Sequence, residues 1–73
     1  EGTGVEQDYS KAIQYYQRAA DLNDSDALNR LGLCYQKGKG VKKNYSKAIE
    51  CYQRAADLGN SDALYNLNHC KKK

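Results

Sequence analysis

The sequence repeats itself at a spacing of 36 residues, and this repetition constrains the fold more than any other feature. When residues 1–37 are placed over residues 37–73, 22 of the 37 aligned pairs are identical. A period of this length is typical of repeat architectures in which each unit is one supersecondary structure. Because such units bury their apolar faces against one another, we expect a single repeat region over residues 1–73 with about two repeats.

Each copy contains two helical patterns. Apolar residues recur every three or four positions, which is the spacing that places them on one face of a helix. The linkers LNDS and LGNS between the patterns are short, so consecutive helices must run antiparallel as hairpins. The sequence therefore predicts an all-α fold of four helices, at about residues 9–22, 26–37, 45–58 and 62–71.

The segment KGKGVKKN at residues 37–44 invites a different interpretation, because glycine-rich loops with lysine can bind phosphate. Its counterpart one period earlier is EGTGVEQD, which keeps the glycines and the valine but none of the lysines. A phosphate loop would also need a preceding strand and a GK[ST] ending. Gly38 instead stands where a helix C-terminal glycine takes a positive φ. Side chains that can accept from the first amides of the four helices are expected at Asp8, Ser25, Asn44 and Ser61.

The formal net charge of +3 is small, and three lysines at residues 71–73 are enough to account for it. Nucleic-acid binding stays open as an alternative that would use this tail and the lysines around the turn, namely Lys37, Lys39, Lys42, Lys43 and Lys47. No signal-peptide pattern and no apolar run of membrane-spanning length occur. Three cysteines without a CxxC pair do not form a disulfide framework, which favours an intracellular, reducing compartment.

The cysteines and His69 could formally provide a zinc ligand set, but the repeat argues against it. Cys34 and Cys70 occupy equivalent positions on alternate helices, so we expect them about 16–20 Å apart, whereas zinc ligands lie about 2 Å from one metal ion. His69 and its chain neighbour Cys70 project about 100° apart around a helix, which does not suit a catalytic pair. The sequence thus predicts a protein without metal, cofactor or catalytic site. Cys34 and Cys51 are expected in the core and Cys70 partly exposed.

The stretch ALNRLGLCYQKGKGVKKNYSKAIECYQRAADLG, at residues 27–59, resembles the Sel-one-like repeat family. That family's pattern is a small residue, LG, tyrosine, GxGV, a capping residue, KA, an aromatic pair and AA; here Cys51 replaces the first aromatic. The tetratricopeptide repeat shares the LGxxY core, but its period is 34. The resemblance implies a right-handed α-solenoid, a tetratricopeptide-like superhelix, that acts as a protein-binding adaptor without enzymatic activity. Because at least three repeats are usually needed for stability, we expect the chain to be part of a longer array.

The helices at about residues 26–37 and 62–71 are the first helices of their family units, and such helices line the concave face of hairpin solenoids. Their buried stripe repeats nearly unchanged, but their outward positions do not. A common core that carries a non-repeating surface is what a binding scaffold requires. We therefore expect a partner's extended segment or helix to lie in a groove formed by Asn29, Arg30, Leu33, Gln36, Tyr65, Asn66 and His69. The alternative is a structural spacer inside a large assembly, which contacts only its neighbours, including flanking repeats of the same array.

Overall fold

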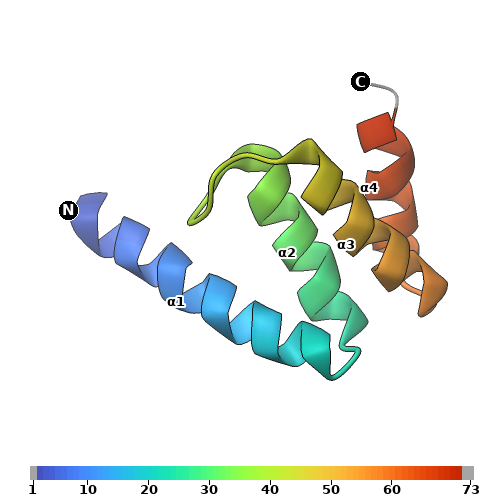
Figure 1. Cartoon of the computed structure of the whole chain (residues 1–73), viewed down its shortest axis with the longest axis horizontal. Coiled ribbons are helices and arrows are strands. Elements are labelled where there is room, and N and C mark those ends of the chain that lie inside the picture. The colour runs from blue at the N-terminus through green and yellow to red at the C-terminus, as the bar shows by residue number, and fades with distance from the viewer. Residues whose placement is uncertain (1, 72–73) are drawn as a thin grey trace.

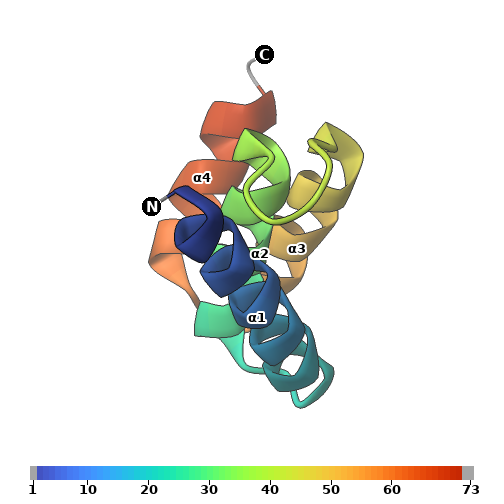
Figure 2. The ribbon, with the colours of Figure 1, turned by 90° about the vertical axis from the view of Figure 1, so that its left-hand side faces the viewer.

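The computed structural model describes residues 2–71 of the chain, with side chains described for residues 9–70. Four helices follow one another: α1 (Gly2–Asp21), α2 (Ser25–Lys37), α3 (Tyr45–Asp57) and α4 (Ser61–Lys71). Each helix packs against its neighbours in the sequence, and consecutive helices run in opposite directions (Figure 1). In the view of Figure 2, α1 lies in front of α2, while α3 and α4 lie on opposite sides. The predicted all-α solenoid of hairpins is confirmed.

The first helix is longer than the sequence pattern predicts, because α1 begins at Gly2 rather than at Tyr9. Asp8 consequently lies inside the helix, and the prediction that it caps α1 is wrong. In the second copy the same GxGV segment is shaped by hydrogen bonds to α2, the helix that precedes it. In the first copy the corresponding residues are part of α1 itself.

The caps of α2 and α4 lie one residue before the predicted serines. The Asp24 carboxylate accepts from the amides of Asp26 and Ala27 at 3.0 and 3.2 Å, and the Asn60 side chain accepts from Ala63 at 2.9 Å. Ser25 and Ser61 are instead the first helical residues. The prediction for α3 is confirmed, since Asn44 Oδ1 accepts from the Lys47 amide at 3.1 Å. Each of α2, α3 and α4 is therefore preceded by a residue whose side chain accepts from otherwise unpaired amides of the first turn.

The loop from α2 to α3 folds back toward α1. Gly38 ends α2 with a φ of 73°, as predicted, and its amide donates to the Cys34 carbonyl at 2.7 Å. Gly40 has a φ of 77°, and a Cβ at this position would lie 2.9 Å from the Tyr9 carbonyl oxygen. The glycine therefore serves both the backbone conformation and a close approach to α1. Val41 packs against the core, so this loop is a structural part of the repeat.

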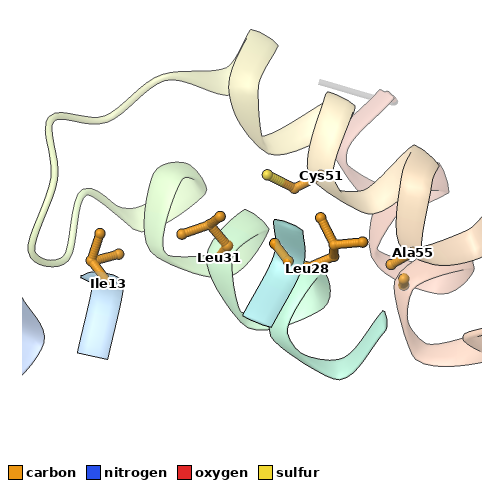
Figure 3. Packing of buried hydrophobic residues seen from close by; sticks show 7 residues of the cluster. Ile13, Leu28, Leu31, Cys51 and Ala55 are labelled. Atoms are coloured by element: carbon orange, nitrogen blue, oxygen red, sulfur yellow. The ribbon is translucent and has the colours of Figure 1, made fainter. Parts of the chain in front are cut away.

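Two connected clusters form the core. The first joins α1, α2 and α3 and contains Ile13, Leu28, Leu31, Cys51 and Ala55 (Figure 3). The second lies around Tyr52, whose side chain is fully buried between α2 and α4 together with Ala48, Leu67 and Cys70. The Tyr52 hydroxyl donates to Gln36 Oε1 at 2.6 Å, which gives the buried phenol a partner.

Gly32 permits a close crossing of α2 and α3. A Cβ added to Gly32 would lie 2.6 Å from the Tyr52 ring, closer than any ordinary contact. One expectation about the core was wrong: Cys70 is 4% exposed rather than partly exposed, because it packs against Tyr52 and Leu67. Tyr45, the first residue of α3, is 44% exposed and lies under the Lys43 ammonium group.

Candidate partner-binding face

The residues predicted to bind a partner come from α2 and α4, which approach each other at one point. The Asn66 amide nitrogen donates to Asn29 Oδ1 at 2.9 Å, and both side chains are half-buried. The expected separation of about 16–20 Å between alternate helices therefore does not hold along their whole length. The hydrogen bond makes α2 and α4 adjacent parts of one surface at this point.

Tyr65 and His69 form the most exposed aromatic pair of this surface. They lie one turn apart on α4, which brings residues at i and i+4 to the same face. Their rings are stacked, with centroids 6.0 Å apart and planes inclined by 14°. Tyr65 is 69% exposed, so the phenol ring is available for contact. A stacked pair presents a flat aromatic surface that has lost part of its side-chain freedom before any partner arrives.

Gln36 and Leu33 are less available than the sequence suggests. The Gln36 carbonyl oxygen already accepts from the buried Tyr52 hydroxyl, so this side chain supports the core. Leu33 is half-buried and packs against the cluster around Tyr52, while another part of it lines a depression between α1 and α2. The expectation that both residues point outward is therefore only partly correct, because a short helix next to two neighbours has few fully free positions.

Arg30 lies on the rim of that depression, which has a volume of about 270 Å³. The second predicted site residue that reaches it is Leu33. The remaining lining comes from α1, from the end of α2 and from the turn: Tyr9, Ala12, Tyr16, Cys34, Lys37 and Lys39. The structure thus divides the predicted residues into two groups: Arg30 and Leu33 at this depression, and Asn29, Tyr65, Asn66 and His69 along the line from α2 to α4.

The contribution of α1 to the depression between α1 and α2 was not predicted from the sequence. Tyr9 and Tyr16 recur as Tyr45 and Tyr52 in the second copy, and this regularity suggests a purely structural role. Tyr52 is fully buried, whereas Tyr16 is only half-buried and lines the depression. The signal that could have identified the site was the spacing of seven between Tyr9 and Tyr16, which places both rings on one face of a helix.

The lysines of the nucleic-acid alternative do not all line one surface. Lys37 and Lys39 line the depression between α1 and α2. Lys42 lines a second hollow formed by the turn and the middle of α1. Lys47 lines a third one, between α1 and α3. Residues 72–73 lie outside the described part of the chain, and the Lys71 side chain is likewise not described.

The cysteines have the environment of packing residues. Burial raises the pKa of the Cys34 and Cys51 thiols above the ordinary value, which disfavours the thiolate at neutral pH. Because thiolates are the nucleophilic and metal-binding form, these thiols are poorly suited to either role. Among the side chains of residues 9–70, no three acidic, cysteine or histidine residues are grouped in a way that could hold a metal ion. None of the helices in this part of the chain has the length and hydropathy needed to cross a bilayer.

Both ends of the helix array expose apolar side chains. On α1, Tyr15 is 68% exposed, whereas its repeat equivalent Cys51 is only 8% exposed in the core. On α4, Leu64 is 50% exposed, whereas its equivalent Leu28 is 1% exposed. The same repeat positions are therefore covered inside the array and uncovered at its ends.

Comparison with known protein families agrees with this geometry. The family model described as Sel1 repeat matches residues 1–24 and 25–60. The second match contains α2, the glycine turn and α3 as one complete unit. No curated protein and no solved structure gave a significant match to the chain.

Proposed function

The chain belongs to the Sel1 repeat family, and from this premise we propose that it is a non-catalytic scaffold that binds another protein on the surface shared by α2 and α4. Sel1 repeats generally mediate interactions between proteins, and the family is typically non-enzymatic. The proposal places this general property on named residues. Tyr65 and His69 would be the principal contacts, with Asn66 and Asn29 extending the surface onto α2.

The observation that carries the proposal is the contrast between the core and the surface of the two copies. Ala27 and Leu31 are 4% and 6% exposed, and their repeat equivalents Ala63 and Leu67 are 0% and 3% exposed. Neighbouring positions of the same helices change in chemistry: Asn29 becomes Tyr65, Arg30 becomes Asn66 and Leu33 becomes His69. The equivalent helices α2 and α4 thus share these core positions but present different side chains on their surfaces.

The exposed aromatic pair has the properties of an interface anchor. Tyrosine and arginine are enriched among the residues that carry most of the binding energy at protein interfaces. Tyr65 has few rotatable bonds and a large apolar ring, and stacking on His69 orders it further. A partner that covers this pair would bury apolar area at a low cost in side-chain entropy.

The exposed ends support a second function, which is stacking against flanking helical units. A helix that covered α1 at Tyr15 would stand in the relation that α2 has to α3, where the equivalent residue Cys51 packs in one cluster with Leu28 and Leu31. A helix beyond α4 would cover Leu64 as α3 and α1 cover Leu28. This is the spacer alternative, and it differs from groove binding because it uses Tyr15 and Leu64 rather than Tyr65 and His69.

Paired alanine substitutions separate the two functions. The full-length chain would be used to capture a partner that has been identified by co-purification, and its affinity would be measured for Tyr65→Ala, His69→Ala and Tyr15→Ala. Loss of an aromatic anchor costs about 2 kcal/mol, which is about 30-fold in affinity. We expect this loss for Tyr65→Ala, a smaller loss for His69→Ala and none for Tyr15→Ala. Unchanged affinity in Tyr65→Ala, with loss in Tyr15→Ala, would reject groove binding in favour of the spacer.

A further inference from the structure

Positively charged side chains line the depression between α1 and α2. Among the described side chains, the charged residues that line it are Arg30, Lys37 and Lys39, which are all cations. In the second copy Arg30 is replaced by Asn66. The helical framework therefore does not require an arginine at this position.

Lys39 is held in place by α1. Its ammonium nitrogen lies 3.4 Å from the Tyr9 hydroxyl oxygen and 5.5 Å from the centroid of the Tyr9 ring. The close approach of Gly40 to the Tyr9 backbone fixes the turn in the position that makes this contact possible. The cation is therefore presented at a defined point of the rim, which lowers the entropy lost when an anion binds.

The floor of the depression is apolar. Leu33, Cys34 and Tyr16 are half-buried and line it from α2 and α1. Figure 1 shows α1 and α2 diverging from the turn that joins them, with the α2–α3 loop lying between their open ends. A volume of about 270 Å³ is below the usual range of about 300–1,000 Å³ for small-molecule pockets. It suits one or two side chains of a peptide rather than a cofactor.

We propose that this depression binds an acidic peptide segment of a partner protein, with one aliphatic or aromatic side chain on the Leu33 floor and carboxylates against Arg30, Lys37 and Lys39. The inference rests on the proposed protein-binding function and names the chemistry of the partner. An apolar floor surrounded by three cations complements a hydrophobic residue with acidic neighbours on both sides. A nucleic-acid strand would require a longer row of phosphate contacts, and three cations around one hollow do not provide it.

Two peptide comparisons test the inference in the full-length chain. The probe is a fluorescein-labelled peptide with one leucine flanked on each side by glutamates, and its affinity is measured by anisotropy. The comparison peptides replace the glutamates by glutamine, or the leucine by serine. We expect each replacement to weaken binding by about tenfold, and we expect the affinity for the acidic peptide to fall as salt is raised. Undetectable binding of the acidic peptide, or equal binding of the glutamine peptide, would overturn the inference.

Charge reversal then locates the site. Arg30 and Lys39 are exposed, so Arg30→Glu and Lys39→Glu leave the core intact, which thermal melts would verify. Each is expected to weaken acidic-peptide binding by about tenfold. The matched control is Lys47→Glu, the same charge change at a residue that lines the hollow between α1 and α3, with an expected effect below about twofold. Equal losses in the control, or preferential binding of a single-stranded oligonucleotide that Arg30→Glu abolishes, would reject the peptide site. If Tyr65→Ala alone weakens capture of the natural partner, the inference fails while the proposed function stands.

Discussion

Replacing Gly32 by alanine tests the packing between α2 and α3 on which the whole repeat depends. In an exposed helix this change would stabilise by about 1 kcal/mol. Here the added Cβ would lie 2.6 Å from Tyr52 Cε1 and 2.7 Å from Cδ1. The ring is fully buried, and its hydroxyl donates to Gln36 at 2.6 Å. The ring cannot withdraw without disturbing both the core and this hydrogen bond.

The expected change follows from these opposing effects. Overpacking costs about 1–3 kcal/mol, the strained hydrogen bond costs about 1 kcal/mol, and the gain in helix propensity returns about 1 kcal/mol. We expect the free energy of unfolding to fall by about 1–3 kcal/mol and the midpoint of thermal unfolding to fall by at least about 5 °C. Urea and thermal unfolding followed by circular dichroism would measure both quantities.

A repeat-equivalent control is available at Asn68, which occupies the position of Gly32 in the second copy and is exposed. Asn68→Ala changes helix propensity without a facing ring, so we expect it to stabilise by no more than about 0.7 kcal/mol. If Gly32→Ala were as stable as the unmodified chain, or more stable, the close crossing of α2 and α3 at Tyr52 would be refuted.

Three further changes test the caps, the turn and the buried thiol and phenol. Asn60→Ala should destabilise the fold by about 1 kcal/mol or more. The effect should exceed that of Asp24→Ala, because Asn60 also donates to Asp26 Oδ1 at 3.1 Å. Equal urea midpoints for the two variants would contradict this expectation. Gly40→Ala should destabilise by at least about 1 kcal/mol, since it combines a positive φ with a clash on the Tyr9 backbone, and an unchanged melting temperature would show that the turn is not held against α1. Burial raises the folded-state pKa of Cys51 and Tyr52 above their ordinary values of 9.0 and 10.0. As the pH rises, the unfolded state therefore loses these protons before the folded state does. We expect the free energy of unfolding to keep its full value below about pH 8.5 and to decline as the pH rises beyond it. A free energy of unfolding that stayed constant up to pH 10.5 would contradict that burial.

The repeat period predicted the framework because core positions depend on local periodicity. Leu31 and Leu67, or Ala27 and Ala63, are buried in both copies as the helical pattern requires. The caps of α2 and α4 were harder to predict because a carboxylate or amide and a serine stand side by side where each of these helices starts. Only the backbone geometry determines which of them reaches the free amides, as Asp24 does rather than Ser25.

The surface was less predictable because it depends on contacts between segments far apart in the sequence. Gln36 lies on the outward side of α2 in a helical projection, but its carbonyl oxygen is taken by the Tyr52 hydroxyl. The depression at Leu33 depends on α1, α2 and the turn at once, and the position of Lys39 follows from its contact with Tyr9. Periodicity places residues on one helix but does not bring three segments together.

Site-specific photo-crosslinking in the full-length chain tests the central claim most directly. A photoreactive phenylalanine analogue would be introduced at Tyr65, on the proposed binding surface, and separately at Gln53, which is exposed on α3. After irradiation with the co-purified partner, we expect a crosslinked product from position 65 and little or none from position 53. A product from position 53 without one from position 65 would contradict the claim that the chain binds its partner on the surface of α2 and α4.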